Sequence, residues 1–177
     1  MLDVELERLT AHLDSLDRPA VAWMLPGVDM DHVSSVLGEP VPDSVARWFR
    51  WCNGIASVEG QLQDDVNAIP GYNPLSIEEG ARMMASNSGD PTLGDHWVPL
   101  LGSAGGDLYA AVWAPGEEAV VVGVLIGEPT EVEFSTIEQM VMFFNRCFDS
   151  GAFFVDDQGQ LAMSPDQYDE IYACTVG

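Results

Sequence analysis

The side chains in this sequence that could carry chemistry are mostly carboxylates. Asp and Glu number 29 among 177 residues. Several of them are adjacent or nearly adjacent: Asp64/Asp65, Glu78/Glu79, Glu117/Glu118, Glu131/Glu133 and Asp156/Asp157. Two carboxyl groups at a suitable separation can act as general acid and general base in a hydrolase. Such pairs also arise by chance in so acidic a chain, so a carboxylate-pair hydrolase is kept as a third hypothesis rather than the first.

Other catalytic or metal-binding motifs are absent from the sequence. The three histidines form no H-x-x-x-H pair, the three cysteines form no C-x-x-C motif, and G-x-S-x-G does not occur. The glycine-rich stretch Gly102–Gly106 has no lysine after it and leads into a strand pattern, which fits a tight turn better than a phosphate cradle. We therefore predict no catalytic, metal-binding or cofactor-binding residues, and we do not expect an enzyme.

Net charge is the dominant property of the chain. Six arginines face 29 carboxylates, lysine is absent, and the formal net charge is −23. No arginine lies between Arg82 and Arg146, whereas carboxylates continue through that stretch. The electrostatic field of a chain with this net charge attracts a basic protein and repels nucleic acid and anionic membranes, because binding phosphate needs Lys and Arg. Solubility, or adaptation to a salty cytoplasm, is the alternative explanation of the same charge.

Composition and length indicate a folded, cytoplasmic protein. Hydrophobic residues make up 47% of the chain, which is enough for a core, and 177 residues suit one domain. Residues 1–9 lack the basic start of a signal peptide, and no apolar run reaches the length of a membrane span. The three widely spaced cysteines do not form a disulfide framework.

Periodicity and capping signals predict four helices in the first half of the chain. They cover residues 2–16, 29–37, Pro42 to Asn53-Gly54, and 76–86. Gly38 ends the second helix, Pro42 fits the first turn of the third, and Ser76–Glu79 is a capping box for the fourth. Residues 54–75 carry little periodicity and predict a long loop with room for one strand.

The second half predicts consecutive strands followed by more helix. The strands cover 97–101, 107–113, 119–126 and 131–134; a helix over 135–149, a hairpin over 153–163 and a last helix from Ser164 follow. Pro99 indicates an edge or a bulge, and Ser135–Glu138 is a capping box. Four tryptophans lie in apolar patterns typical of a core: Trp23, Trp48, Trp97 and Trp113. This order predicts a single α+β domain over residues 1–177, with a central antiparallel sheet flanked by N-terminal and C-terminal helices.

Three segments, taken in order, carry a family resemblance. The first is Leu37–Phe49 (LGEPVPDSVARWF), followed by Cys52–Gly54 as a helix exit. The second is Trp97–Gly102 with Gly105–Tyr109, which forms a W-x-P and G-D-x-Y strand pair. The third is the late helix Ser135–Phe148. Together these segments resemble the SUKH superfamily.

The resemblance implies an α+β fold that uses no cofactor. It covers about residues 28–150, and residues 151–177 form a C-terminal extension beyond it. One departure from the family pattern is the long loop between the second and third helices of the match. Bacterial members of the family are immunity proteins that bind and neutralise toxins, many of them nucleases. Fungal members regulate cell-wall synthesis through protein–protein contacts.

The leading hypothesis from charge and resemblance together is an immunity protein that neutralises a toxin through an acidic surface. The expected partner is a basic protein, a cognate toxin with a nucleic-acid groove, rather than nucleic acid or a membrane. Carboxylates in or beside predicted loops are the expected contacts: Glu59, Asp64, Asp65, Asp107, Glu117 and Glu118. The alternative is a regulatory or scaffold module of the cell-wall synthesis regulator type without a toxin partner.

Overall fold

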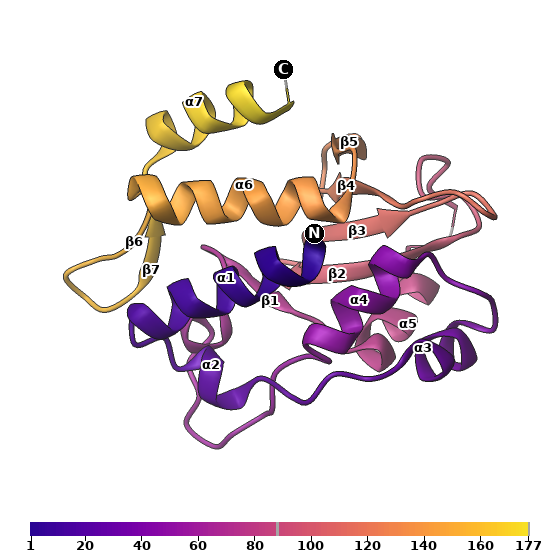
Figure 1. The fold of residues 1–177 in the computed structure, drawn as a ribbon, viewed down its shortest axis with the longest axis horizontal. Coiled ribbons are helices and arrows are strands. Elements are labelled where there is room, and N and C mark those ends of the chain that lie inside the picture. Colours follow the sequence, from indigo (N-terminus) through magenta and orange to yellow (C-terminus); the bar gives the residue numbers. More distant parts are fainter. Residues whose placement is uncertain (88, 177) are drawn as a thin grey trace.

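The chain folds as α+β, as the sequence predicted (Figure 1). The computed structural model describes residues 1–87 and 89–176. Ser88, which lies between the predicted helix 76–86 and the predicted strand 97–101, and Gly177, in the predicted C-terminal extension, lie outside the described residues. The helices are α1 (Leu2–Ser15), α2 (Ala20–Trp23), α3 (Met30–Leu37), α4 (Asp43–Trp51), α5 (Ile77–Ser86), α6 (Ile137–Ser150) and α7 (Pro165–Val176).

Within the described residues the main sheet has five antiparallel strands in the order β1-β2-β3-β4-β5. The strands are β1 (Tyr72–Pro74), β2 (Trp97–Ser103), β3 (Leu108–Val112), β4 (Val120–Val124) and β5 (Glu131–Phe134). A separate hairpin pairs β6 (Phe153–Val155) with β7 (Leu161–Met163). Spatial order follows chain order, so each predicted strand pairs with the next one along the chain.

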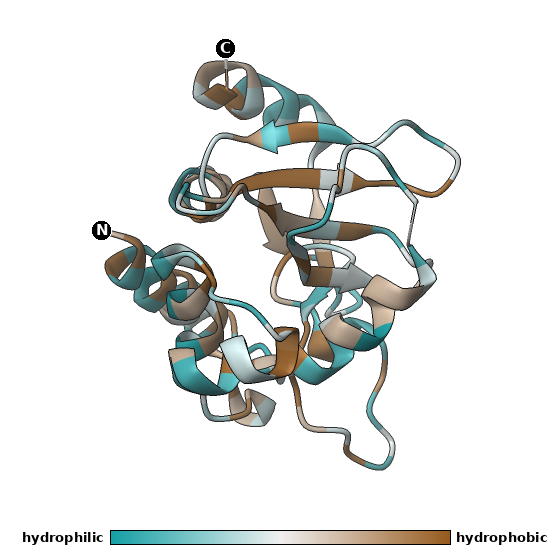
Figure 2. Ribbon diagram, turned by 90° about the vertical axis from the view of Figure 1, so that its right-hand side faces the viewer, coloured by the Kyte–Doolittle hydropathy of each residue, from teal (hydrophilic) through white to brown (hydrophobic). Residues whose placement is uncertain are grey.

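Helix α6 is the centre of the main core. It packs between α1 and α7 and also contacts β4, β5 and β6 (Figure 1). Its residues Met140, Phe143, Phe144 and Cys147 are fully buried, because apolar side chains recur at helical spacing. Figure 2 shows the central strands as largely hydrophobic, whereas the helices alternate hydrophilic and hydrophobic residues. Each large side chain buried in this way contributes roughly 1.5–3 kcal/mol.

The two faces of the sheet bury separate clusters. Ala111 pairs with Val121 and both lie in the main core with α6. The preceding pair, Ala110 with Val122, lies in a smaller cluster with Leu93 and Trp97. Successive strand residues point to opposite faces of the sheet, and each face buries one of these clusters. Because β3 and β4 are covered on both sides, their sequences are nearly continuous apolar runs.

The structure decides between the two alternatives predicted for Pro99 and corrects the prediction for Trp23. Pro99 is not on an edge strand, because β2 lies between β1 and β3. The predicted bulge is present, since the β2–β3 register shifts between Pro99 and Leu101. Trp23 is only half-buried, whereas Trp48, Trp97 and Trp113 are buried as predicted.

The cap of α6 lies one residue later than the sequence pattern predicted. Thr136, not Ser135, is the N-cap, and its Oγ1 accepts from the N–H of Gln139 at 3.0 Å. Gln139 Oε1 accepts in return from the N–H of Ser135 at 2.7 Å. Glu138, which the pattern placed in the capping box, instead accepts from the N-terminal ammonium of Met1 at 3.1 Å.

Replacing Thr136 with alanine is expected to lower the free energy of unfolding by about 1 kcal/mol, because the Gln139 N–H then loses its acceptor. Ser135→Ala is the matched control; it removes only an exposed hydroxyl that donates to Gln139 at 2.8 Å and is expected to cost less than about 0.5 kcal/mol. Urea denaturation followed by tryptophan fluorescence measures both. Equal losses would show that Ser135 shares the capping role.

The helices also bear on membrane association. None of those in residues 1–87 and 89–176 combines the length and the apolar character needed to cross a bilayer. All of them are 14 residues or shorter, and the two longest, α1 and α6, pack against each other.

Candidate functional site

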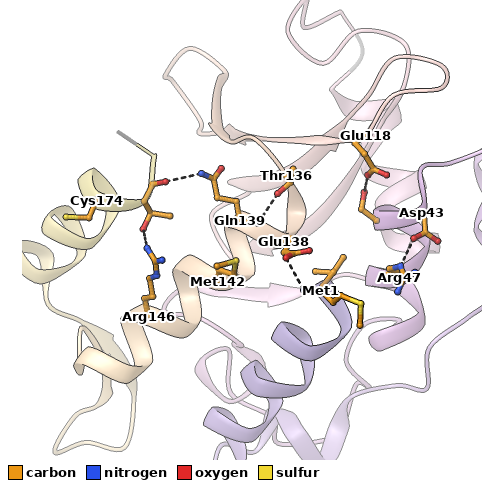
Figure 3. A pocket seen from close by; sticks show the side chains of 13 residues that line it. Met1, Asp43, Arg47, Glu118, Thr136, Glu138, Gln139, Met142, Arg146 and Cys174 are labelled. Carbon is orange, nitrogen blue, oxygen red and sulfur yellow. Dashed lines mark hydrogen bonds and ion pairs between the residues drawn. The ribbon is translucent and has the colours of Figure 1, made fainter.

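A cavity of about 710 Å³ opens where the start of α1, the start of α4, α6 and the end of α7 meet (Figure 3). The charged side chains around it are largely paired with one another. The Met1 ammonium meets Glu138 at 3.1 Å, and Arg47 is paired with both Asp43 and Asp3. Arg146 donates to the Thr175 hydroxyl at 3.2 Å and so ties α6 to α7. Because most of these contacts join separate helices, the arrangement fits a structural role better than a catalytic one.

A second cavity, of about 470 Å³, adjoins the first and shares Asp43 and Glu118 with it. We call it the acidic hollow. Its rim carries the carboxylates Glu39, Asp43, Glu117 and Glu118. Its apolar lining comes from Pro40, Val41, Pro42, Trp113 and Pro115. The segment before α4 thus faces the turn between β3 and β4, and the hollow combines apolar surface with concentrated negative charge.

The rim carboxylates differ in the hydrogen bonds and ion pairs that they make with other side chains of the chain. Glu39 contacts Nδ1 of His96, the one imidazole that lines the hollow within the described residues. Glu118 Oε2 accepts from the Ser44 hydroxyl at 2.7 Å, which leaves its charge uncompensated. Glu117 is exposed, and its side chain makes no hydrogen bond or ion pair within residues 1–87 and 89–176. The hollow therefore has more negative than positive charge and keeps at least one carboxylate free to meet a partner.

The hollow gives a good environment for a cationic side chain. The stem of a lysine or arginine is apolar and can lie along Trp113 and the prolines, while its charged end reaches the rim. Trp113 is only 7% exposed, and the centroids of its ring and of the His96 ring lie 6.4 Å apart. The lining is therefore held in place by packing. A preformed lining of this kind costs little ordering on binding.

The six carboxylates predicted as partner contacts do not form one surface. Glu117 and Glu118 lie at the acidic hollow, on the turn between β3 and β4. Asp107 lies at the opposite end of β3, where its Oδ1 accepts from the N–H of Ile126 at 2.9 Å. Glu59 is exposed in the loop between α4 and β1, and Asp65 in the same loop accepts from the N–H of Leu62 at 3.1 Å. Of the six, the structure thus places only Glu117 and Glu118 at the acidic hollow.

Asp64, the sixth of these residues, is held inside the chain. Arg18 is 4% exposed, and its Nη2 donates to Asp64 Oδ2 at 2.7 Å and to the Asp64 carbonyl at 2.6 Å. Its Nη1 donates to the carbonyl of Gly159 at 3.0 Å. The N–H of Leu161 donates to Asp64 Oδ1 at 3.1 Å. Asp64 therefore joins the end of α1, the loop before β1 and the β6–β7 hairpin, and little of its charge is left for a partner.

Sequence reasoning missed Glu39, Asp43 and His96 as members of the hollow. Residues 39–43 read only as the entry to a helix, and Trp113 read only as a core residue. The available signal was a proline-rich segment with an acid at each end. Its meeting with residues 113–118 depends on a tertiary contact, which spacing along the chain does not reveal.

The remaining titratable groups give little support to a nucleophile or a general acid. Burial raises the pKa of the Cys52 and Cys147 thiols to about 12, which disfavours the thiolate. Hydrogen bonds from His32 and Thr130 lower the pKa of Glu78 and Asp90 respectively, whereas a general acid needs a raised one. No group of three or more His, Cys, Asp or Glu side chains that could hold a metal ion occurs in residues 1–87 and 89–176.

No protein-family model and no curated protein matches this chain. The resemblance to the SUKH superfamily therefore stays a prediction from the residues that carry it.

Proposed function

We propose that this chain is a protein-binding module that neutralises a basic toxin, in the manner of the bacterial SUKH immunity proteins. The observation that carries the proposal is the acidic hollow. Apolar surface and uncompensated carboxylates meet there in a chain whose formal net charge is −23. Interfaces draw most of their affinity from a few well-packed pockets of this kind, while the surrounding charge accelerates encounter.

The family resemblance supports the same region by a separate line of reasoning. The first motif, residues 37–49, contains the segment 39–43 that supplies half of the rim and three of the apolar lining residues. The second motif begins at Trp97, directly after His96. Two of the three segments that resemble the family therefore supply or border part of the hollow.

The toxin partner is proposed to be basic, because the field of this chain selects for positive charge. A nuclease that binds nucleic acid presents lysines and arginines in its groove. An acidic protein placed over that groove replaces the phosphates with carboxylates and excludes the substrate. Inhibition in this arrangement needs no chemistry from this chain, only affinity and coverage.

The test is to co-express the chain with the protein encoded by the adjacent gene. The expected result is rescue of growth together with co-purification of the two proteins. If neither occurs, the immunity proposal is wrong. Several weak binders and no tight one would instead favour the regulatory or scaffold alternative.

The Glu117→Lys variant is expected to weaken the complex about tenfold, because it places a positive charge in the rim opposite a basic side chain. Glu128→Lys is the matched control. Glu128 is also exposed, changes the net charge equally, and lies in the turn before β5 outside the hollow. Its expected effect is below about twofold. Surface plasmon resonance measures both, and equal weakening would show that the overall charge matters rather than the hollow.

A further inference from the structure

All four tyrosines of the chain line one cavity of about 410 Å³, which we call the tyrosine pocket. They come from three distant segments: Tyr72 from β1, Tyr109 from β3, and Tyr168 and Tyr172 from α7. The pocket lies at the end of β3 opposite to the acidic hollow, since Tyr109 is near the start of that strand and Trp113 follows its end. The C-terminal extension therefore supplies one wall of a cavity whose other wall is the sheet.

The aromatic rings of the pocket are held in defined positions. The centroids of Tyr72 and Tyr109 lie 5.0 Å apart, and the rings of Tyr168 and Tyr172 are stacked with an interplanar angle of 9°. Phe143 of α6 contacts Tyr168 and Tyr172 edge-on, at 5.0 and 5.6 Å between centroids. Tyr rings fixed by packing present their faces to a ligand at little cost in conformational entropy.

Two carboxylates line the same pocket. Glu133 of β5 is half-buried, and its Oε2 accepts from the Tyr172 hydroxyl at 2.6 Å. Asp169 of α7 is exposed. Burial, followed by other effects that include the negative charge of Glu133, raises the pKa of Tyr72 and Tyr168. The hydroxyls therefore stay neutral at physiological pH, and the charge of the pocket is that of its carboxylates.

Among the described residues that line the pocket, none is a cation that could compensate these carboxylates. Lysine is absent and arginine does not occur in residues 51–81, 83–145 or 147–177, which together supply every side chain that lines the pocket. Within the described residues, the Glu133 carboxylate makes no ion pair, and its hydrogen bond comes from the Tyr172 hydroxyl. A half-buried carboxylate surrounded by aromatic rings gains stability when a cation enters.

We propose that the tyrosine pocket binds an arginine side chain of a basic protein, with the guanidinium stacked on the tyrosine rings and paired with Glu133 and Asp169. The proposal rests on the proposed function only for the source of the arginine. Arginine fits better than lysine because its planar guanidinium stacks on aromatic faces, is weakly hydrated, and can serve two carboxylates at once. The acidic hollow and the tyrosine pocket would then be two separate anchoring points for one basic partner.

The direct test uses the full chain and the peptide acetyl-Gly-Arg-Gly-amide, without any toxin. Tyrosine rings labelled with ¹³C give signals from the four residues of the pocket alone, so NMR titration reports on this site specifically. Saturable shifts of these signals are expected with the arginine peptide. The lysine peptide should bind about threefold more weakly or worse, and the uncharged citrulline peptide should produce no saturable shift. Equal binding of all three peptides, or none, would overturn the proposal.

Two variants locate the binding. Asp169→Asn is expected to weaken the arginine peptide about threefold, whereas Glu170→Gln, its exposed neighbour outside the pocket, should leave binding within about 1.5-fold. Tyr72→Leu should weaken it about fivefold by removing one aromatic face. Circular dichroism checks that each variant is folded. Asp169 is exposed, so the Asp169→Asn variant still tests the site if Tyr72→Leu does not fold. Equal effects of Asp169→Asn and Glu170→Gln would contradict the assignment.

The outcome separates this proposal from the proposed function. If the peptide binds as expected but the adjacent gene product does not, the pocket recognises arginine and the immunity proposal fails. If the toxin binds and Asp169→Asn leaves the arginine peptide unaffected, the immunity proposal stands and the tyrosine pocket is not its arginine site.

Discussion

Arg18→Ala is expected to lower the free energy of unfolding by about 3 kcal/mol. The side chain of Arg18 is almost fully buried, and it donates to three oxygens in two segments that are distant in sequence. Its removal leaves the carbonyls of Asp64 and Gly159 without these donors and the Asp64 carboxylate without its cation. The loss falls at the low end of the range for buried pairs, because the Asp64 side chain is 22% exposed and water can reach it.

Urea denaturation followed by tryptophan fluorescence measures this loss, with Arg82→Ala as the control. Arg82 is exposed on α5, and its truncation is expected to cost less than about 0.5 kcal/mol. If the two variants unfold at the same urea concentration, the Arg18 network does not hold the loop and the hairpin together. Asp64→Asn tests the carboxylate that pairs with Arg18. This variant is expected to lower the free energy of unfolding more than it lowers the affinity for the toxin. That result would remove Asp64 from the predicted partner contacts.

Local signals accounted for most of the fold. Gly38 placed the end of α3 and the capping box Ser76–Glu79 placed the start of α5, because each signal acts within one turn of the helix it bounds. In the structure Gly38 has a positive φ, and the Ser76 hydroxyl accepts from the N–H of Glu79. The one-residue error at Thr136 arose because Ser135 and Thr136 can both cap a helix. Only the backbone conformation distinguishes them.

The two candidate binding regions were not accessible to the same reasoning. The acidic hollow depends on residues 39–43 meeting residues 113–118, and the tyrosine pocket gathers side chains from Tyr72 to Tyr172. Such contacts are set by the order of strands and by how α6 packs between α1 and α7. Exposure in a loop was also a poor guide: Asp64 lies in the predicted loop, yet its partners are Arg18, 46 positions earlier, and the backbone of the hairpin.

Most arginines of the chain contact other residues of the same chain. Among the described residues, Arg8 pairs with Asp149 and Arg18 with Asp64, Arg47 pairs with Asp43, and Arg146 donates to Thr175. The Arg8 pair joins α1 to α6, the Arg18 pair joins the segment after α1 to the loop before β1, and the Arg146 hydrogen bond joins α6 to α7, whereas the Arg47–Asp43 pair lies within α4. Most surface carboxylates are left without a basic neighbour, so several of the few arginines are used in contacts within the fold and the surface presented to the solvent is mainly negative.

This distribution predicts a large effect of salt on association with a basic partner. Raising the ionic strength from about 0.05 M to about 0.5 M is expected to slow association roughly 100-fold, because the Debye length contracts from about 14 Å to about 4 Å and screens the field before contact. The dissociation rate is expected to change much less, since contacts inside the hollow are partly shielded from ions. Stopped-flow mixing of the chain with its toxin measures both rates, and a flat dependence of the association rate would argue against electrostatic steering.

The double variant Glu117→Gln/Glu118→Gln separates the field of the whole chain from the hollow itself. Neutralising these two carboxylates changes the net charge only from −23 to −21, so the salt dependence of association should be nearly that of the unmodified chain. Dissociation should be about tenfold faster, because the cation in the hollow loses its nearest carboxylates. The opposite pattern, a strongly slowed association with unchanged dissociation, would place these carboxylates outside the bound interface and assign them to steering alone.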